Sequence, residues 1–231
     1  LRMRPEDDGA REIDPAGFGN LAHNALRILR HHPALADEHQ IRELLLAELE
    51  RLARAQYGAR PTFAAAVQIH SLRLRLGAAA RVQAALVQDG WRIIAAEEKF
   101  EAELDGMLVR ARLDRIDRHL KTGAIRILDY KTAESGDDPL KKHFHPRSEE
   151  RWSDLQLPLY RYVYEQLHPP ADGAPEVVAG YFNLPKAAGD TGIAAMPWKT
   201  RTGEDLYTDA LAKARQVVAN VRAGRFWPPT D

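Results

Sequence analysis

The chain has 231 residues, of which 45% are hydrophobic and 29% charged, a composition typical of a globular protein rather than a disordered one. Lys plus Arg and Asp plus Glu both number 33, so the net charge of zero gives no global argument for nucleic-acid binding and leaves only local basic patches. No apolar run reaches the roughly 18 residues of a membrane span and no signal peptide is recognisable, so we expect a cytoplasmic protein.

The chain contains no cysteine, which excludes disulfides, thiolate nucleophiles, zinc knuckles and iron–sulfur clusters within these residues. Any metal site must therefore use oxygen and imidazole ligands. A ligand set dominated by carboxylates would indicate magnesium or manganese. Because the first residue is Leu1, we expect an excised domain or a processed product of a larger protein.

The first 90 residues predict a helical segment that follows a polar lead-in. Apolar residues recur at helical spacing in three stretches, which we expect to form helices at 15–32, 37–56 and 62–88. Asp89-Gly90 then signals a turn.

After this turn the pattern changes to that of strands. Three consecutive strands are expected at 91–104, 107–118 and 124–132, joined by hairpin turns at Asp105-Gly106 and 121–123. The polar stretch 133–152 is interpreted as a flexible loop with one short helix at most. The remaining expected elements are a helix at 153–167, a strand at 176–184, a further possible strand at 193–198 and a helix at 204–222. This order predicts a single α/β domain over 1–231, with a helical segment at 1–90 and a sheet-and-helix core at 91–231.

Asp129-Tyr130-Lys131 lies at the end of an apolar strand. The period of two places Asp129 and Lys131 on the same face as Ile125 and Ile127. A carboxylate on such a face is costly unless it is paired or bound to a cation. An intra-strand Asp–Lys pair at a solvent-accessible strand end explains this segment, taken alone, equally well.

The preceding strand carries two acids, Asp114 and Asp117, either of which can come close to Asp129 if the strands pair through the turn at 121–123. Converging carboxylates repel each other unless a divalent cation lies between them. Alternation places Asp114 and Asp117 on opposite faces, so the pattern does not choose between them. In the alternative, one of them pairs with a neighbouring arginine: Arg112, Arg115 or Arg118.

Three weaker signals lie outside these two strands. Gln156 and Tyr160 are four residues apart on a predicted helix and share a face, which ordinary amphipathic spacing also explains. His23 faces much as Leu26 does, and a lone histidine on an apolar face is more often a core residue than a ligand. Glu97 and its neighbour Glu98 end an apolar run, so the first strand can also supply an acid.

Taken together, these segments resemble the PD-(D/E)XK nuclease superfamily, and within it the RecB/AddB-type nuclease domains of bacterial helicase–nuclease recombination enzymes. The resemblance rests on five motifs in order: Gly19-x-x-x-His23, Glu97 with Phe100, Arg112-Leu113-Asp114-Arg115-Ile116-Asp117, Asp129-Tyr130-Lys131-Thr132 and Gln156-x-x-x-Tyr160. The chain departs from this branch in having no proline before Asp114. It also lacks the cysteines that tether an iron–sulfur cluster in many AddB-type domains, so no cluster is expected within this chain.

The resemblance implies a restriction-endonuclease-like α/β fold, with a central mixed sheet of about four to five strands flanked by helices and an N-terminal helical segment. It also implies Mg²⁺ or Mn²⁺ as cofactor. The expected ligands are His23, Asp114, Asp129 and the backbone carbonyl of Tyr130.

The remaining motif residues receive supporting roles from the same resemblance. Lys131 would orient or help deprotonate the attacking water, and Glu97 would be an outer or second-metal carboxylate. Gln156 and Tyr160 would position DNA or the metal shell. The candidates for contacts with the DNA backbone are Arg110, Arg112 and the basic loop 141–147 with Lys141 and Lys142, although a solvated surface explains that loop at least as well.

The expected function is therefore a metal-dependent deoxyribonuclease, acting as an exonuclease or endonuclease on single-stranded DNA that a helicase domain or subunit delivers during double-strand-break repair. The alternative is a nuclease-like module that no longer cuts and serves as a DNA-binding or scaffolding part of such a complex. Intact Asp114, Asp129 and Lys131 argue against loss of activity. A stand-alone restriction-like endonuclease is disfavoured because no initiating methionine and no separate specificity domain are present.

Overall fold

Three helices precede the sheet in the computed structural model, which describes residues 12–148 and 150–225. They are α1 (Pro15–Leu26), α2 (Glu38–Tyr57) and α3 (Phe63–Asp89). Each begins at a residue whose side-chain oxygen accepts a hydrogen bond from a backbone N–H of the first turn, namely Asp14, Asp37 and Thr62. Helix α3 is followed directly by Gly90, whose φ of 110° lies in the left-handed region that favours glycine.

The five strands form one mixed sheet in chain order: β1 (Trp91–Leu104), β2 (Met107–His119), β3 (Ile125–Lys131), β4 (Val178–Asn183) and β5 (Gly192–Ala195). Only β3 and β4 run parallel, and the chain between them contains α4 (Pro139–His143) and α5 (Gln156–Leu167). The closing helix is α6 (Leu206–Arg222). The expected α/β class, with a mixed sheet of four to five strands and an N-terminal helical segment, is confirmed.

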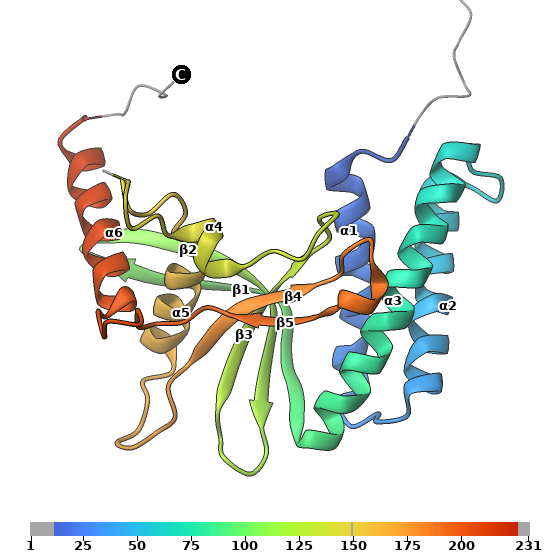
Figure 1. Ribbon diagram of the computed structural model, residues 1–231, viewed down its shortest axis with the longest axis horizontal. Coiled ribbons are helices and arrows are strands. Elements are labelled where there is room, and N and C mark those ends of the chain that lie inside the picture. Colours follow the sequence, from blue (N-terminus) through green and yellow to red (C-terminus); the bar gives the residue numbers. More distant parts are fainter. Residues whose placement is uncertain (1–11, 149, 226–231) are drawn as a thin grey trace, which may run out of the picture.

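Helices cover the two faces of the sheet and divide the core into two clusters (Figure 1). The cluster formed with α1, α2 and α3 contains Leu128, Tyr130 and Phe182. The other, formed with α5 and α6, contains Ile127 and Tyr181. Alternation along β3 therefore holds as predicted, because neighbouring side chains enter different clusters.

Four expected elements differ from those observed. The first helix ends at Leu26 and is followed by a 3₁₀ helix, η1 (Arg27–His31). This helix stops before His32 because the residue that precedes a proline, here Pro33, disfavours helical geometry. The stretch 133–152 is more structured than predicted, since Asp138 caps α4 and an antiparallel bridge joins Phe144 to Trp152. Conversely, the helix predicted at 153–167 begins at Gln156. A short 3₁₀ helix, η2 (Ala188–Asp190), precedes β5, which ends at Ala195.

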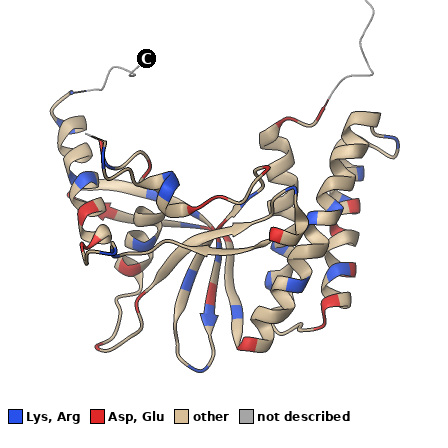
Figure 2. Ribbon diagram, in the orientation of Figure 1, with Lys and Arg blue, Asp and Glu red and all other residues tan. Residues whose placement is uncertain are grey.

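The helices differ in charge. Figure 2 shows acidic and basic residues interleaved along α2, whereas α1 carries neither kind and the charged residues of α3 are arginines apart from Asp89 at its end. Within 12–148 and 150–225, no helix combines the length and the hydropathy that a membrane crossing requires.

Candidate metal centre and the lysine beside it

The candidate site opens where β2 and β3 separate. Their ladder pairs Arg115–Arg118 with Ile125–Leu128 and goes no further. Beyond it, the buried carboxylate of Asp114 accepts a hydrogen bond from the backbone N–H of Tyr130 at 2.9 Å. The carboxylate thus satisfies a backbone donor in place of a ladder partner and is fixed between the strands.

Glu97 reaches the same place from β1 through an unusual backbone conformation. The β1–β2 register pairs Ala96 with Arg115 and Glu98 with Leu113, which places Glu97 level with Asp114. Its φ of 55° is left-handed, a conformation that costs energy for a residue with a side chain. The Glu97 side chain is 8% exposed, so the backbone strain accompanies a carboxylate directed inward.

The two oxygens of Glu97 have different partners. Oε2 accepts from Nε of Arg112 at 2.9 Å, whereas Oε1 is buried and accepts no hydrogen bond from the described residues. A buried carboxylate oxygen without a donor is costly and marks a place where a cation would be stabilised.

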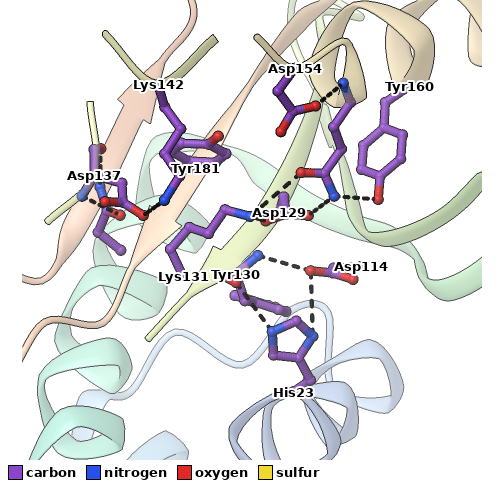
Figure 3. Close-up of polar contacts among 12 residues, drawn as sticks. His23, Asp114, Asp129, Tyr130, Lys131, Asp137, Lys142, Asp154, Tyr160 and Tyr181 are labelled. Atoms are coloured by element: carbon purple, nitrogen blue, oxygen red, sulfur yellow. Dashed lines mark hydrogen bonds and ion pairs between the residues drawn. The ribbon is translucent and has the colours of Figure 1, made fainter. Parts of the chain in front are cut away.

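His23 approaches both carboxylates from α1, on the face of the sheet that α1, α2 and α3 cover. Figure 3 shows its ring beside Asp114. Its Nδ1 lies 3.4 Å from Oδ2 of Asp114 and 3.5 Å from Oε1 of Glu97. Nε2 lies 3.2 Å from the carbonyl oxygen of Tyr130. His23 is thus not a passive core residue, because every one of these contacts is polar.

The charges around His23 control its protonation. Burial by itself lowers the pKa of His23, but the neighbouring Asp114 and Glu97 outweigh it and raise the pKa to about 10. Without a metal, the imidazole therefore carries a proton at neutral pH and acts as the counter-charge of the two acids.

The donor atoms of His23, Glu97 and Asp114 suit a divalent cation. One ligand atom from each lies within 4.8 Å of the other two. Carboxylate oxygens with one imidazole match magnesium or manganese, and the unpartnered Oε1 of Glu97 is the observation that supports the fit. Glu97, expected as an outer or second-metal acid, lies as close to His23 as Asp114 does.

Asp129 and Lys131 lie on β3, on the face opposite to the side chain of Tyr130 (Figure 3). Nζ of Lys131 is 2.7 Å from Oδ2 of Asp129, so the intra-strand pair considered for this segment does form. Burial, and next the charge of Asp114, raise the pKa of Asp129 although Lys131 opposes the shift.

The motif Gln156/Tyr160 joins this second group, as its helical spacing allowed. Nε2 of Gln156 donates to Oδ1 of Asp129 at 2.8 Å and to the hydroxyl of Tyr160 at 2.8 Å. Its Oε1 lies 3.5 Å from Nζ of Lys131. One amide therefore bridges the carboxylate and the ammonium.

Asp117, which the pattern alone could not distinguish from Asp114, has a structural role. It is completely buried and binds Arg115 at 2.7 Å and Arg126 at 2.9 Å. Its charge is thus neutralised by two guanidinium groups within the sheet, away from His23.

The four candidate DNA-contacting residues all carry acidic partners. Arg112 binds Glu97, and Arg110 lies 2.8 Å from Glu101. In the segment that contains α4, Lys141 lies 3.7 Å from Asp138 and Lys142 lies 3.2 Å from Asp137. All four side chains are at least 51% exposed, so they remain accessible to a ligand.

Two residues near Lys131 had no recognisable signal in the sequence. Tyr181 lies within an apolar strand, where an aromatic residue is expected for packing. His143 lies among basic residues of a segment predicted to be a loop, yet it is completely buried. Only the packing of α4 against the sheet brings the two together.

Comparisons with known proteins identify one family and two solved structures that are similar to this chain. The family model described as the PD-(D/E)XK nuclease superfamily matches residues 1–231. No curated protein matches the chain. Among solved structures, a candidate exonuclease from Eubacterium rectale has 11% identity and a TM-score of 0.46, with coverage of 99% of this chain and 89% of the other. A structure described as SSO0001 has 14% identity and a TM-score of 0.31, with coverage of 92% and 77% respectively.

Proposed function

Because the chain belongs to the PD-(D/E)XK nuclease superfamily, we propose that it is a divalent-metal-dependent deoxyribonuclease that hydrolyses phosphodiester bonds. The observation that carries the proposal is the cluster of His23, Glu97 and Asp114, in which a buried oxygen of Glu97 makes no hydrogen bond within the described residues and has the imidazole of His23 at 3.5 Å as its charged neighbour. The Asp129–Lys131 pair lies on the adjoining strand and supplies an acid and a cation to the same region.

The residues that would hold Mg²⁺ or Mn²⁺ are His23, Asp114 and Glu97. Asp129, also expected as a ligand, is not part of this cluster, and the carbonyl oxygen of Tyr130 lies 3.2 Å from Nε2 of His23. A bound divalent cation supplies two effects in such a site, a more acidic bound water and neutralisation of charge on the phosphate. The role proposed for Glu97 is therefore that of a direct ligand.

Lys131 is the residue that would orient the attacking water and offset negative charge on the phosphate. Its ammonium is held by Asp129 and by the amide of Gln156, and its side chain remains 24% exposed, so solvent and substrate can reach it. Tyr160 acts through Gln156, since its hydroxyl accepts from the same amide that binds Asp129.

The biological task is inferred from the motif order shared with RecB/AddB-type domains. We propose a domain that acts on single-stranded DNA delivered by a helicase domain or subunit, in the cytoplasm, during double-strand-break repair. The exposed side chains of Arg110, Arg112, Lys141 and Lys142 are the proposed contacts with the DNA backbone. Zero net charge predicts weak DNA affinity without such a partner.

A titration of Mg²⁺ and Mn²⁺ on labelled single- and double-stranded DNA tests the proposal, with Asp129→Ala and Lys131→Ala as variants. Glu98→Gln is a matched control, because this acid neighbours Glu97 but its side chain is 45% exposed and lies 3.6 Å from Arg30. We expect metal-dependent cleavage by the parent and by the control, and none by the two site variants. DNA binding without cleavage by the parent would instead favour a silent scaffold module, and equal cleavage by all four proteins would overturn the site assignment.

A further inference from the structure

Tyr181 is the aromatic residue that lies against the ammonium of Lys131. The parallel register places it beside Asp129 on β4, on the face that α5 covers. The side chain is fully buried, and Nζ of Lys131 lies 4.8 Å from the centre of its ring (Figure 3). This distance is inside the roughly 6 Å over which an aromatic face attracts a cation.

His143 fixes the other end of the Tyr181 ring. Its Nε2 lies 2.6 Å from the hydroxyl of Tyr181, and its Nδ1 lies 2.9 Å from the backbone carbonyl of Asp154. Because a carbonyl only accepts, Nδ1 carries the hydrogen, and burial lowers the pKa of His143, which keeps the ring neutral. Nε2 is therefore an acceptor, and the Tyr181 hydroxyl donates to it.

The same segment also positions the amide on the opposite side of Lys131. The carboxylate of Asp154 accepts from the backbone N–H of Gln156 at 2.7 Å, at the start of α5. The side chain of Gln156 then contacts both Asp129 and Lys131. Asp154 thus connects the His143–Tyr181 pair with the Gln156 amide, which bridges Asp129 and Lys131.

We propose that Tyr181 is a positioning residue for Lys131 and that His143, which is buried with it, fixes the Tyr181 ring in place. A lysine ammonium stands on a flexible four-carbon stem, so its position has to be restricted by its neighbours. A phenol that donates its hydrogen has a more electron-rich ring, which strengthens the attraction of the ring face for the ammonium. The kinetic consequence rests on the nuclease function proposed above.

The kinetic test compares two substitutions of Tyr181 with the same substitutions of Tyr162. Tyr162 is a matched control because it is also buried and donates through its hydroxyl, to the carbonyl of Glu103 at 2.6 Å. Tyr181→Phe keeps the ring and loses the hydroxyl, whereas Tyr181→Leu loses both. The measurements are kcat and KM for DNA cleavage, with thermal unfolding of every variant alongside.

We expect Tyr181→Leu to lower kcat on the order of 10- to 100-fold with little change in KM, since misplacement of a reacting group costs rate rather than binding. Tyr181→Phe is expected to fall between the parent and Tyr181→Leu, because it keeps the ring but loses the hydrogen bond to His143, and both Tyr162 variants are expected to keep nearly all of the parental kcat. The proposal is overturned if Tyr181→Phe is as slow as Tyr181→Leu, if Tyr162→Leu is equally slow, or if Tyr181→Leu retains the parental kcat.

A second measurement does not depend on cleavage. Protons above an aromatic ring resonate upfield, so the ε-methylene of Lys131 should be shifted upfield in a proton–carbon NMR spectrum, where Lys131→Arg identifies the signal. We expect His143→Ala to weaken this shift and Tyr162→Leu to preserve it. If the parent cleaves no DNA but shows the shift, the proposed function fails and the positioning stands; an unshifted Lys131 signal in the parent overturns the positioning itself.

Discussion

The carboxylate of Asp114 accepts a hydrogen bond from the backbone N–H of Tyr130, at the point where the β2–β3 ladder ends. One side chain thereby does two things: it satisfies a buried backbone donor, and it presents its charge to His23 at 3.4 Å. The candidate metal centre exists because the two strands part here, since a continuing ladder would leave no room for a carboxylate between them.

This double role predicts that two substitutions of Asp114 separate stability from activity. Asp114→Ala leaves the Tyr130 N–H buried without an acceptor and should lower the free energy of unfolding by about 1–3 kcal/mol. Asp114→Asn keeps an acceptor oxygen and should cost clearly less, whereas both variants should lose DNA cleavage. Urea unfolding in a chelating buffer measures the difference. Equal destabilisation by the two substitutions would show that the hydrogen bond to Tyr130 is not what Asp114 contributes to stability.

Glu97 is predicted to couple metal binding to stability. A ligand that binds only the folded chain at about 100 times its Kd stabilises it by about 2.7 kcal/mol. We therefore expect Mg²⁺ or Mn²⁺ to raise the melting temperature of the parent and of Glu98→Gln, and to raise that of Glu97→Gln much less. Differential scanning fluorimetry with and without the metal provides the measurement. A full metal response in Glu97→Gln would exclude Glu97 as a ligand.

The raised pKa of His23 predicts a pH-dependent contribution to stability. The imidazole binds its proton more tightly in the folded chain, with a pKa of about 10, than at the unperturbed value of 6.5. Its stabilising contribution is therefore fully present below pH 6.5 and is lost as the pH rises toward 10. In metal-free buffer, the difference in unfolding free energy between the parent and His23→Ala should shrink over this interval.

Denaturant unfolding at several pH values tests this prediction for His23. His31→Ala is the control, because its side chain is exposed in η1 and no acidic partner is observed for it within the described residues. A difference between parent and His23→Ala that grows with pH would contradict the assignment of His23 as the counter-charge of the two acids.

The basic side chains of α4 are predicted to act on DNA affinity rather than on chemistry. If Lys141 and Lys142 contact phosphates, the double Lys→Gln variant should bind DNA more weakly. The slope of the logarithm of its binding constant against the logarithm of the salt concentration should be smaller in magnitude by about one to two. Lys121→Gln removes one positive charge at the turn between β2 and β3, away from the site, and it should leave the slope unchanged. Fluorescence anisotropy over a range of salt concentrations, with calcium in place of magnesium, provides the slopes. Equal slopes for the three proteins would place the DNA path elsewhere.

Sequence periodicity determined the order of helices and strands, because apolar spacing reflects the burial of one face of each element. It also placed Asp129 and Lys131 on one side of β3, since the period of two in a strand is fixed by covalent geometry. Tertiary structure decided between Asp114 and Asp117: Arg115 and Arg126 neutralise the latter, and no pattern within one strand reveals which arginines will surround an acid.

Tertiary structure alone also brought His143 to Tyr181 and gave Glu97 its left-handed backbone. Both depend on contacts between segments that are distant in the chain. The Asp-Tyr-Lys motif therefore marked the candidate site, whereas the packing of α1 and α4 against the sheet decided which side chains surround it. Local sequence determines local backbone geometry. The side chains that surround His23 and Lys131, and so determine the pKa of the histidine and the position of the lysine, come together only when distant segments pack against one another.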